Sequence, residues 1–197
     1  MEKPEDVMFS PAVKAEQVRL GSREAFEDRD WQTEITDDLR QFLAAIDTFF
    51  FATASADGRP YIQHRGGPAG FLKPIGSHML AFADFAGNRQ YITLGHLKEN
   101  DRAHIFILHY ATQQRLKLWG RARVIEGDTE LMERLVDPSY KAKPQRAIAF
   151  RIEAWDINCR QHIMARYTEA EIAPAVNQLA QRIKELEEEV ARLKATP

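Results

Sequence analysis

The segment HRGGPAGF, residues 64–71, places a cation and two adjacent glycines directly after the strand-like residues YIQ. Because glycine has no side chain, Gly66 and Gly67 would let a planar ring or a phosphate approach main-chain N–H groups. The guanidinium of Arg65 could bind a phosphate through two parallel hydrogen bonds. An ordinary loop is the competing interpretation. The segment is therefore a candidate site for a phosphorylated ligand with a planar part.

A second segment, DFAGNRQY, residues 84–91, has an amide and a cation where a helix is expected to begin. We expect Asn88 to precede this helix and Arg89 to lie in its first turn. Free main-chain N–H groups and the helix dipole favour anions at such an end. Asn88 and Arg89 would then form an anion cradle. The competing interpretation is a plain helix cap with a surface arginine.

Standard catalytic signatures are missing from the sequence. It has no nucleophile elbow, P-loop, zinc-protease helix or dinucleotide-binding fingerprint. The six histidines lack the spacing of metal ligands. The single cysteine, Cys159, excludes an intrachain disulfide and a multi-cysteine metal site, and we expect it to be a structural thiol. We therefore expect no metal site and assign no catalytic residue.

The composition, with 44% hydrophobic and 28% charged residues over 197 positions, is that of a soluble globular protein. A formal net charge of −2 argues against nucleic acid or an anionic membrane as a partner. No uncharged apolar segment is long enough to span a bilayer, and the acidic start MEKPED does not resemble a signal peptide. These features predict a cytoplasmic protein whose ligands are small molecules.

From residue 49 the sequence changes to short β-rich segments separated by turn residues. Six of them are expected to be strands: FFFATAS, YIQHR, HMLAFA, AHIFILHY, RLKLWGRARVI and RAIAFRIEAWD. The dipeptide Asp57-Gly58 suits a tight turn and predicts a hairpin of the first two strands. Meandering strands with few helices suit a small closed barrel, because closure leaves no exposed edge.

Helical patterns flank and interrupt these strands. Four helices are expected, within SPAVKAEQVRLGS, TDDLRQFLAAID, NRQYITLGHLKEN (around residues 88 to 98) and DTELMERLV (residues 128 to 136). In the first of them, Ser10 suits the N-cap and Gly21 suits the C-terminal end.

The C-terminal region has a different pattern. Thr168 and Glu171 form a capping box, and Pro174 is expected to end or kink that helix or to begin a new one. Apolar residues then recur at alternating spacings of three and four, as in a coiled coil: Val176, Leu179, Ile183, Leu186, Val190 and Leu193. This stripe could pack on the barrel of its own chain or pair in a dimer.

The predicted organisation has three parts: a helical arm over residues 1–35, a barrel domain over residues 36–166, and a helix with a heptad pattern over residues 167–197.

Four stretches together resemble the pyridoxamine 5′-phosphate oxidase-like family of FMN-binding split barrels: ATASADGRPYIQHRGGPAGF, LAFADFAGNRQYITLGHLKENDRAHIFI, LKLWGRARVIEGD and EAWDINCRQHI. Their order and spacing carry the resemblance, which covers about residues 40 to 165. It implies a mainly β fold, a six-stranded split β-barrel with flanking helices, here followed by a coiled-coil-like C-terminal helix. It also implies FMN as the cofactor, bound at the interface of a homodimer.

The resemblance assigns candidate cofactor-binding residues. Those implied at the phosphate and beside the isoalloxazine ring are Arg65, Gly66, Gly67, Asn88, Arg89 and Gln90. Arg65 matches the family's phosphate arginine, and the two glycines adjoin the ring. Asn88, Arg89 and Gln90 match a Ser-Arg-Lys stretch of the family, with Gln90 in place of the lysine. Others are implied near the ring or from the second chain: Gln114, Arg115, Trp155, Asn158 and His162. Core packing is an equal alternative for Trp155.

These implications make an FMN-dependent oxidoreductase the leading hypothesis, with NADH or NADPH as a candidate electron donor. The arginine-rich C-terminal segment with which the true oxidases grip their substrate is not found, because this sequence ends in RLKATP. We therefore do not expect vitamin B6 oxidase activity. A non-catalytic flavin-binding or carrier protein is one alternative. A reductase that uses the deazaflavin F420 in place of FMN is another.

Overall fold

The computed structural model describes residues 3–27, 29–158 and 161–195. The described chain forms two compact units. The first lies within residues 1–109 and 114–159, and the second within residues 110–113 and 160–197. No helix in the described part of the chain is long and apolar enough to cross a lipid bilayer.

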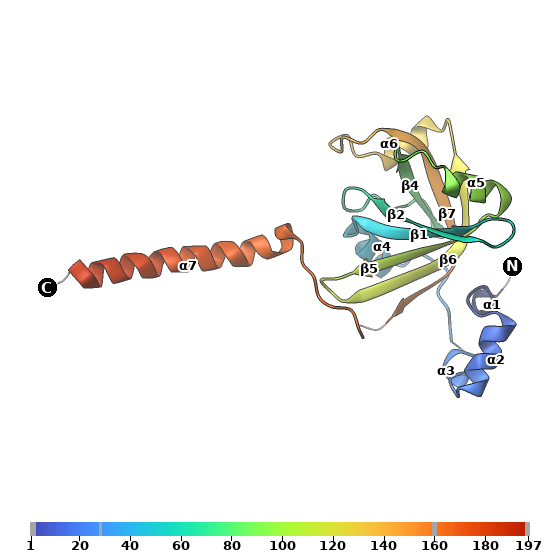
Figure 1. The fold of residues 1–197 in the computed structure, drawn as a ribbon, viewed down its shortest axis with the longest axis horizontal. Coiled ribbons are helices and arrows are strands. Elements are labelled where there is room, and N and C mark those ends of the chain that lie inside the picture. The colour runs from blue at the N-terminus through green and yellow to red at the C-terminus, as the bar shows by residue number, and fades with distance from the viewer. Residues whose placement is uncertain (1–2, 28, 159–160, 196–197) are drawn as a thin grey trace. The chain divides into compact units, whose positions relative to one another are not determined.

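Seven antiparallel strands form one sheet in the first unit (Figure 1). They are β1 Thr48–Ala54, β2 Pro60–Gly66, β3 Lys73–Pro74, β4 Met79–Phe85, β5 Arg102–His109, β6 Gln114–Ile125 and β7 Pro144–Asn158. Their order in the sheet is β2-β1-β5-β6-β7-β4-β3. Six of them are the six predicted strands, and β3 adds two residues beside β4. The mainly β fold with flanking helices is confirmed.

The sheet curls around an apolar core. The rings of Phe49 and Phe51 in β1 lie 5.1 and 5.7 Å from the ring of Phe82 in β4, although three strands separate β1 from β4. These three side chains and Phe150 of β7 are completely buried. Such contacts require the two ends of the sheet to face each other, as in the wall of a barrel.

The predicted hairpin of β1 and β2 is confirmed. Gly58 has a φ of +83°, which glycine adopts without strain, and the Ser55 N–H donates to the Arg59 carbonyl at 3.1 Å. Each residue of β1 pairs with one of β2, including Phe49 with Arg65. The turn therefore sets the register that places the predicted phosphate arginine.

A bulge interrupts the pairing of β6 with β7. The register shifts between Trp119 and Gly120, and a Cβ atom on Gly120 would lie 2.0 Å from the carbonyl oxygen of Arg151. Only glycine fits this close approach of two backbones. A bulge also bends its strand and increases the local twist, which helps the sheet to curl.

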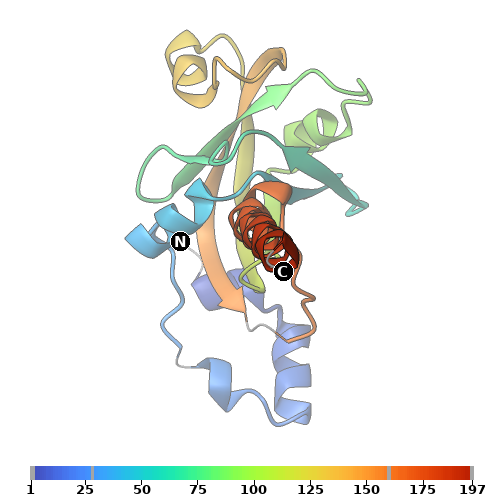
Figure 2. The same cartoon turned by 90° about the vertical axis from the view of Figure 1, so that its left-hand side faces the viewer.

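Helices flank the barrel. They are α1 Pro4–Met8, α2 Pro11–Arg19, α3 Glu24–Glu27, α4 Asp37–Ala44, α5 Ile92–Glu99 and α6 Thr129–Leu135. In both views α1 to α3 lie at the end of the barrel opposite α5 and α6 (Figures 1 and 2). Helix α4 is capped by Thr36, whose hydroxyl accepts from the Leu39 N–H at 3.2 Å, and it buries Leu39 and Leu43 completely.

The second unit consists mainly of α7, Glu169–Ala195. The predicted capping box is confirmed, because the Thr168 N–H donates to the Glu171 carboxylate at 2.7 Å and the Glu171 N–H donates to the Thr168 hydroxyl at 3.3 Å. Pro174 lies inside this one continuous helix, so it neither ends a helix nor begins another. The proline removes a single main-chain hydrogen bond near the N-terminus, which the rest of the helix outweighs.

Candidate functional site

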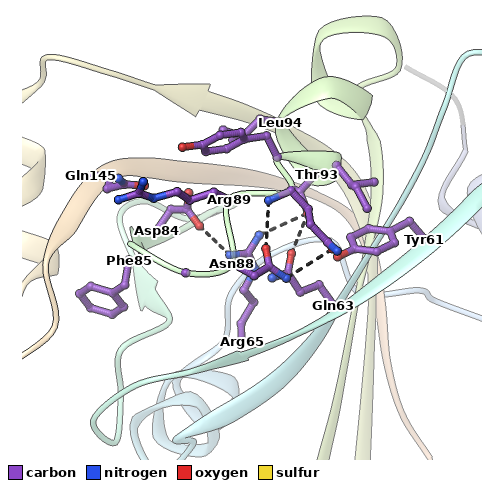
Figure 3. A pocket seen from close by; sticks show the side chains of 14 residues that line it. Tyr61, Gln63, Arg65, Asp84, Phe85, Asn88, Arg89, Thr93, Leu94 and Gln145 are labelled. Atoms are coloured by element: carbon purple, nitrogen blue, oxygen red, sulfur yellow. Dashed lines mark hydrogen bonds and ion pairs between the residues drawn. The ribbon is translucent and has the colours of Figure 1, made fainter.

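A cleft lies at the seam of the barrel, where β2 and β4 approach each other from opposite ends of the sheet (Figure 3). Its walls come from β2, the end of β4, the loop before α5, the start of α5 and Gln145 of β7. The cleft has a volume of about 50 Å³. A single water molecule needs roughly 10–15 Å³ on this measure. The space therefore suits a phosphate-sized group.

One face of β2 forms a wall of the cleft. Tyr61, Gln63 and Arg65 alternate along the strand, so their side chains point to the same side. In the register with β1, Arg65 stands opposite Phe49 and Gln63 opposite Phe51, which both point into the core. The Arg65 side chain is therefore directed inwards, where a charge is unfavourable unless it is paired.

An ion pair across the seam holds Arg65. Its Nη1 donates to Oδ1 of Asp84 in β4 at 2.5 Å, and its Nη2 donates to the Thr93 hydroxyl at 3.3 Å (Figure 3). The Thr93 hydroxyl in turn donates to Oε1 of Gln63 at 3.3 Å. Since β2 and β4 are not hydrogen-bonded neighbours, this network joins two otherwise separate parts of the sheet.

Two arginines share the Asp84 carboxylate at the seam. Asp84 is 8% exposed, and its other carboxylate oxygen lies 3.6 Å from Nε of Arg146 in β7. Arg65 and Arg146, both half-buried, share this carboxylate, and Nη1 of Arg146 also donates to the exposed Glu126 carboxylate at 3.1 Å. The Nε atoms of Arg65 and Arg146 are buried without a hydrogen-bond partner among the described residues. The two arginines are thus matched by two carboxylates, and each arginine keeps one N–H group without an acceptor in the described chain.

The loop between β4 and α5 adds a further cation. Arg89 and Tyr91 adopt φ values of 60° and 54°, in the left-handed region that is rare for residues other than glycine. The Asn88 side chain accepts from the Gln90 N–H at 3.1 Å and so stabilises this loop. In the described part of the chain no hydrogen bond or ion pair involves the Arg89 side chain, which is exposed at the cleft.

The predicted start of the helix at this site is wrong. Helix α5 begins at Ile92, so Arg89 lies in the loop before it rather than in the first turn. The left-handed backbone of Arg89 and Tyr91 cannot continue into a right-handed helix. Tyr91, at the N-cap position, makes no side-chain hydrogen bond to the helix.

The structure brings four of the predicted residues together at the cleft: Arg65, Asn88, Arg89 and Gln90. Gly66 and Gly67 follow directly after Arg65 but do not line it. A Cβ atom on Gly67 would lie 2.6 Å from the ring of Phe71, so internal packing is enough to require glycine there.

Gln114, Arg115 and Trp155 do not line the cleft. Gln114 and Arg115 begin β6, and Arg115 pairs with Asn158 at the end of β7. His162 belongs to the second unit, where it adopts a φ of 63°. The Asn158 side chain and all of Cys159 lie outside the described residues.

Trp155 packs in the core. It is 9% exposed, and its indole N–H donates to the Glu34 carbonyl at 2.8 Å. Its main-chain N–H donates to the Gln32 carbonyl at 3.0 Å. Trp155 therefore fixes the segment before α4 against β7.

Sequence reasoning missed Gln63, Asp84 and Thr93. Two signals could have identified the first two. Gln63 lies two positions before Arg65 and therefore shares its face of the strand. Asp84 is a carboxylate in the otherwise apolar strand MLAFADF, and a buried carboxylate requires a partner. No comparable signal marks Thr93, because its role depends on where α5 packs.

The described residues contain no group of three or more histidine, cysteine, aspartate or glutamate side chains that could hold a metal ion.

Comparison with known proteins agrees with this architecture. The family model for pyridoxamine 5′-phosphate oxidase matches residues 35–159. Because this match covers more than half of the sequence, the chain belongs to the pyridoxamine 5′-phosphate oxidase-like family. No curated protein sequence matches it.

Solved structures share the fold at low sequence identity. HupZ from Group A Streptococcus aligns with a TM-score of 0.50 and 15% identity, over 67% of this chain and 99% of HupZ. The H111A variant of HupZ gives a TM-score of 0.51 and 13% identity, over 63% of this chain and 99% of the variant. An FMN-binding protein from Syntrophomonas wolfei subsp. wolfei gives a TM-score of 0.48 and 16% identity, over 75% of this chain and 95% of that protein. The likeness concerns the fold alone, and this fold is a split barrel.

Proposed function

We propose that the protein binds FMN and is an FMN-dependent oxidoreductase whose substrate is unassigned. One observation carries the proposal: a phosphate-sized cleft lies between the half-buried Arg65 and the exposed Arg89, in a chain of the pyridoxamine 5′-phosphate oxidase-like family. Two arginines and one aspartate line this cleft, so its lining carries a net positive charge.

The residues present fit the phosphate end of the cofactor. No described residue pairs with the Arg89 guanidinium, and Arg65 lines the same cleft. A phosphate has acceptor oxygens on several sides and could contact both arginines, while the start of α5 adds main-chain donors. The structure thus supports Arg65 and Arg89 as the phosphate ligands, with Asn88 shaping the loop and Gln90 beside them.

The cleft is too small for a whole flavin, since drug-sized ligands occupy roughly 300–1,000 Å³. We propose that the ring lies outside it and that a second chain in a homodimer helps to cover the ring. The proposed ring contacts are Gly66, Gly67, Gln114, Arg115, Asn158 and His162. Trp155 would act by holding β7 in place, because its own side chain is buried.

When bound, the flavin supplies the hydride and electron transfer, and the protein supplies binding and orientation. Gln114 and Arg115 would donate hydrogen bonds to the polar edge of the ring and favour negative charge there. No side chain is required to act as a strong acid or base. We propose NADH or NADPH as the electron donor and the cytoplasm as the location.

The first experiment is an absorption spectrum of the purified protein, followed by titration of the apoprotein with FMN and with riboflavin. If Arg89 contacts the phosphate, Arg89→Ala will weaken FMN binding by about tenfold to a hundredfold, the value of one charged hydrogen bond. Binding of riboflavin, which has no phosphate, will not change. Arg59→Ala is the matched control, because Arg59 is an equally exposed arginine on the β1–β2 hairpin.

Equal losses for FMN and riboflavin, or no loss for either, would remove Arg89 from the phosphate site. Oxidation of NADH or NADPH by the FMN-loaded protein with an acceptor would support catalysis. FMN binding without turnover would instead favour the carrier alternative. Binding of F420 in preference to FMN would replace the cofactor but keep the phosphate site.

A further inference from the structure

Helix α7 carries an apolar stripe that the described chain leaves exposed. Its large side chains are between 43% and 69% exposed: Ile172, Val176, Leu179, Ile183, Leu186, Val190 and Leu193. A stripe of this length is too apolar to remain in water when a complementary surface is available. The stripe therefore needs a partner, and the sequence of the helix identifies which one.

The stripe has the residue types of a two-stranded parallel coiled coil. If Val176 is assigned to heptad position a, the a positions are Val176, Ile183 and Val190, and the following d positions are Leu179, Leu186 and Leu193. All a residues are β-branched and all these d residues are leucine. This combination favours two parallel strands over trimers or tetramers.

Pro174 does not oppose this pairing. In the same heptad assignment it occupies position f, on the side of the helix that faces away from a partner. The next two f positions, Gln181 and Glu188, are polar and exposed, and the last f position of the helix is the exposed Ala195. The helix therefore has one apolar face and one polar face over its whole heptad region.

The charges beside the stripe match a second copy of the same helix. In a parallel pair, each g residue lies beside the e residue five positions further along the partner. Arg182 at g would then meet Glu187 of the second copy, and Glu189 at g would meet Lys194 of the second copy. By symmetry, the dimer contains each of these attractive pairs twice. No like charges meet at these positions.

In an antiparallel pair, fewer of the same charged residues would meet a residue of opposite charge. In that arrangement g residues face g residues and e residues face e residues. With the stripes fully overlapped, Arg182 would still meet Glu189 of the second copy, but Glu187 would meet Ala180. An antiparallel pair therefore has fewer attractive charge pairs. It also loses the preference for parallel pairing that β-branched a residues and leucine d residues provide.

We propose that α7 of this protein forms a parallel, in-register two-stranded coiled coil with α7 of a second copy. Arg182 currently donates to Glu185 of its own helix at 3.2 Å, and this exposed pair is weak enough to be shared with or replaced by Glu187 of the second copy. The proposal does not depend on the proposed flavin site.

The test uses the full-length chain with Cys159→Ser, which removes the native thiol. Leu179→Cys then introduces a thiol at position d, and Gln181→Cys introduces one at the outward f position two residues away. In a parallel pair the two copies of residue 179 adjoin, within disulfide reach. Under mild oxidation at low protein concentration we expect the first variant to form a covalent dimer roughly tenfold faster than the second.

This readout reports on α7 even if the barrels also associate. In an antiparallel pair residue 179 would lie beside residue 190 of the other copy, about 16 Å from its own counterpart. Slow cross-linking of Leu179→Cys, or equal rates for the two variants, would overturn the proposal.

A charge exchange tests the register in the same cross-linking assay. Glu187→Lys places a lysine beside Arg182 of the second copy and should slow cross-linking at position 179 by roughly tenfold at concentrations near the dissociation constant. Arg182→Glu combined with Glu187→Lys restores an attractive pair and should restore the rate. Glu188→Lys, the same change on the outer face, is the matched control. Failure of the double variant to recover, or an equal loss in the control, would contradict the parallel register.

Discussion

At the scale of single residues, Arg65 has two roles that compete for the same guanidinium. Its ion pair with Asp84 closes the seam of the barrel, and it also lines the cleft proposed to hold the phosphate. A buried pair stabilises little compared with an apolar replacement, but removing one partner leaves an uncompensated charge. The same residue therefore contributes to the barrel and to the proposed phosphate site.

Asp84→Asn tests this arrangement. The variant leaves the half-buried Arg65 without a carboxylate and removes one of the two carboxylates that pair with Arg146, so we expect the free energy of unfolding to fall by about 3 kcal/mol. Inorganic phosphate should stabilise the variant more than the wild type, because it can occupy a more positive site. Denaturant titrations with and without phosphate measure both effects.

Asp57→Asn is the control for this variant. Asp57 forms an exposed ion pair with Arg59, which contributes less than about 1 kcal/mol. If Asp84→Asn lowered the free energy of unfolding as little as this control, the ion pair at the seam would not be an important contact of the barrel.

A second residue-scale feature lies on the β5–β6 pair. Burial lowers the pKa of His104 to about 4, and the neighbouring Lys117 ammonium acts in the same direction. The imidazole packs edge-on against Trp119, with ring centroids 4.8 Å apart. His104 is therefore neutral in the folded protein at pH values where an unfolded chain already binds a proton.

The sign of the pH effect follows from this lowered pKa. In the unfolded chain histidine titrates near pH 6.5. The stability that neutral His104 provides is present above that value and is lost as the pH falls from 6.5 towards about 4. His104→Phe keeps an aromatic ring beside Trp119 but replaces the imidazole with a side chain that does not titrate. Between pH 7 and pH 4.5 the wild type should lose about 1–3 kcal/mol more stability than the variant. Parallel stability curves for the two proteins would show that His104 titrates normally.

At the scale of secondary-structure elements, the bulge in β6 and the left-handed loop before α5 shape the barrel in different ways. The bulge is fixed by the contact between Gly120 and the Arg151 backbone. The loop is fixed by main-chain conformation and by the Asn88 side chain. At the bulge and at the loop the chain changes direction, although the hydrophobic pattern of the sequence alone would predict that the strand or helix continues.

Gly120→Ala tests the bulge. A methyl group would lie 2.0 Å from the Arg151 carbonyl oxygen, so the strands must separate or the bulge must move. We expect a loss of about 3 kcal/mol or more in the free energy of unfolding. Gly95→Ala is the matched control, because a Cβ atom there meets nothing within 4 Å in helix α5 and alanine favours helix by about 1 kcal/mol. Thermal melts of both variants give the comparison, and a stable Gly120→Ala would mean that β6 and β7 can pair without the bulge.

At the scale of the whole molecule, the two units differ in how they are stabilised. The barrel has a large apolar core with side chains from β1, β4, β5, β6 and β7, and a second, smaller apolar cluster where α6 packs on β4 and β7. Helix α7 has no buried residue. Isolated helices are only marginally stable in water, so α7 depends on a partner for much of its stability. The barrel does not need α7 for its core.

A chain that ends at Ala173 should therefore keep the barrel folded. We expect its cooperative thermal unfolding to remain and its midpoint to change by only a few degrees, while most of the α7 helical signal in circular dichroism disappears. Its affinity for FMN should also be retained if the proposed site lies in the barrel. Loss of cooperative unfolding would show that the second unit is part of the barrel's stability.

The sequence alone determined the elements whose signals are local. The six main strands, the Asp57-Gly58 hairpin, the N-caps at Ser10 and Thr36, and the capping box at Thr168 were all predictable, because alternation, turn residues and caps act over a few positions. The resemblance to a family came from the same local stretches, and it placed Arg65 and Arg89 at one site.

Tertiary structure alone decided what depends on contacts between distant segments. The pairing of Arg65 with Asp84 and Thr93 exists only because the curled sheet brings β2, β4 and α5 to one seam. The start of α5 at Ile92 and the packing of Gly67 against Phe71 likewise depend on neighbours that are not adjacent in sequence. Sequence patterns record local preference, whereas charge pairing and close packing are properties of the assembled barrel.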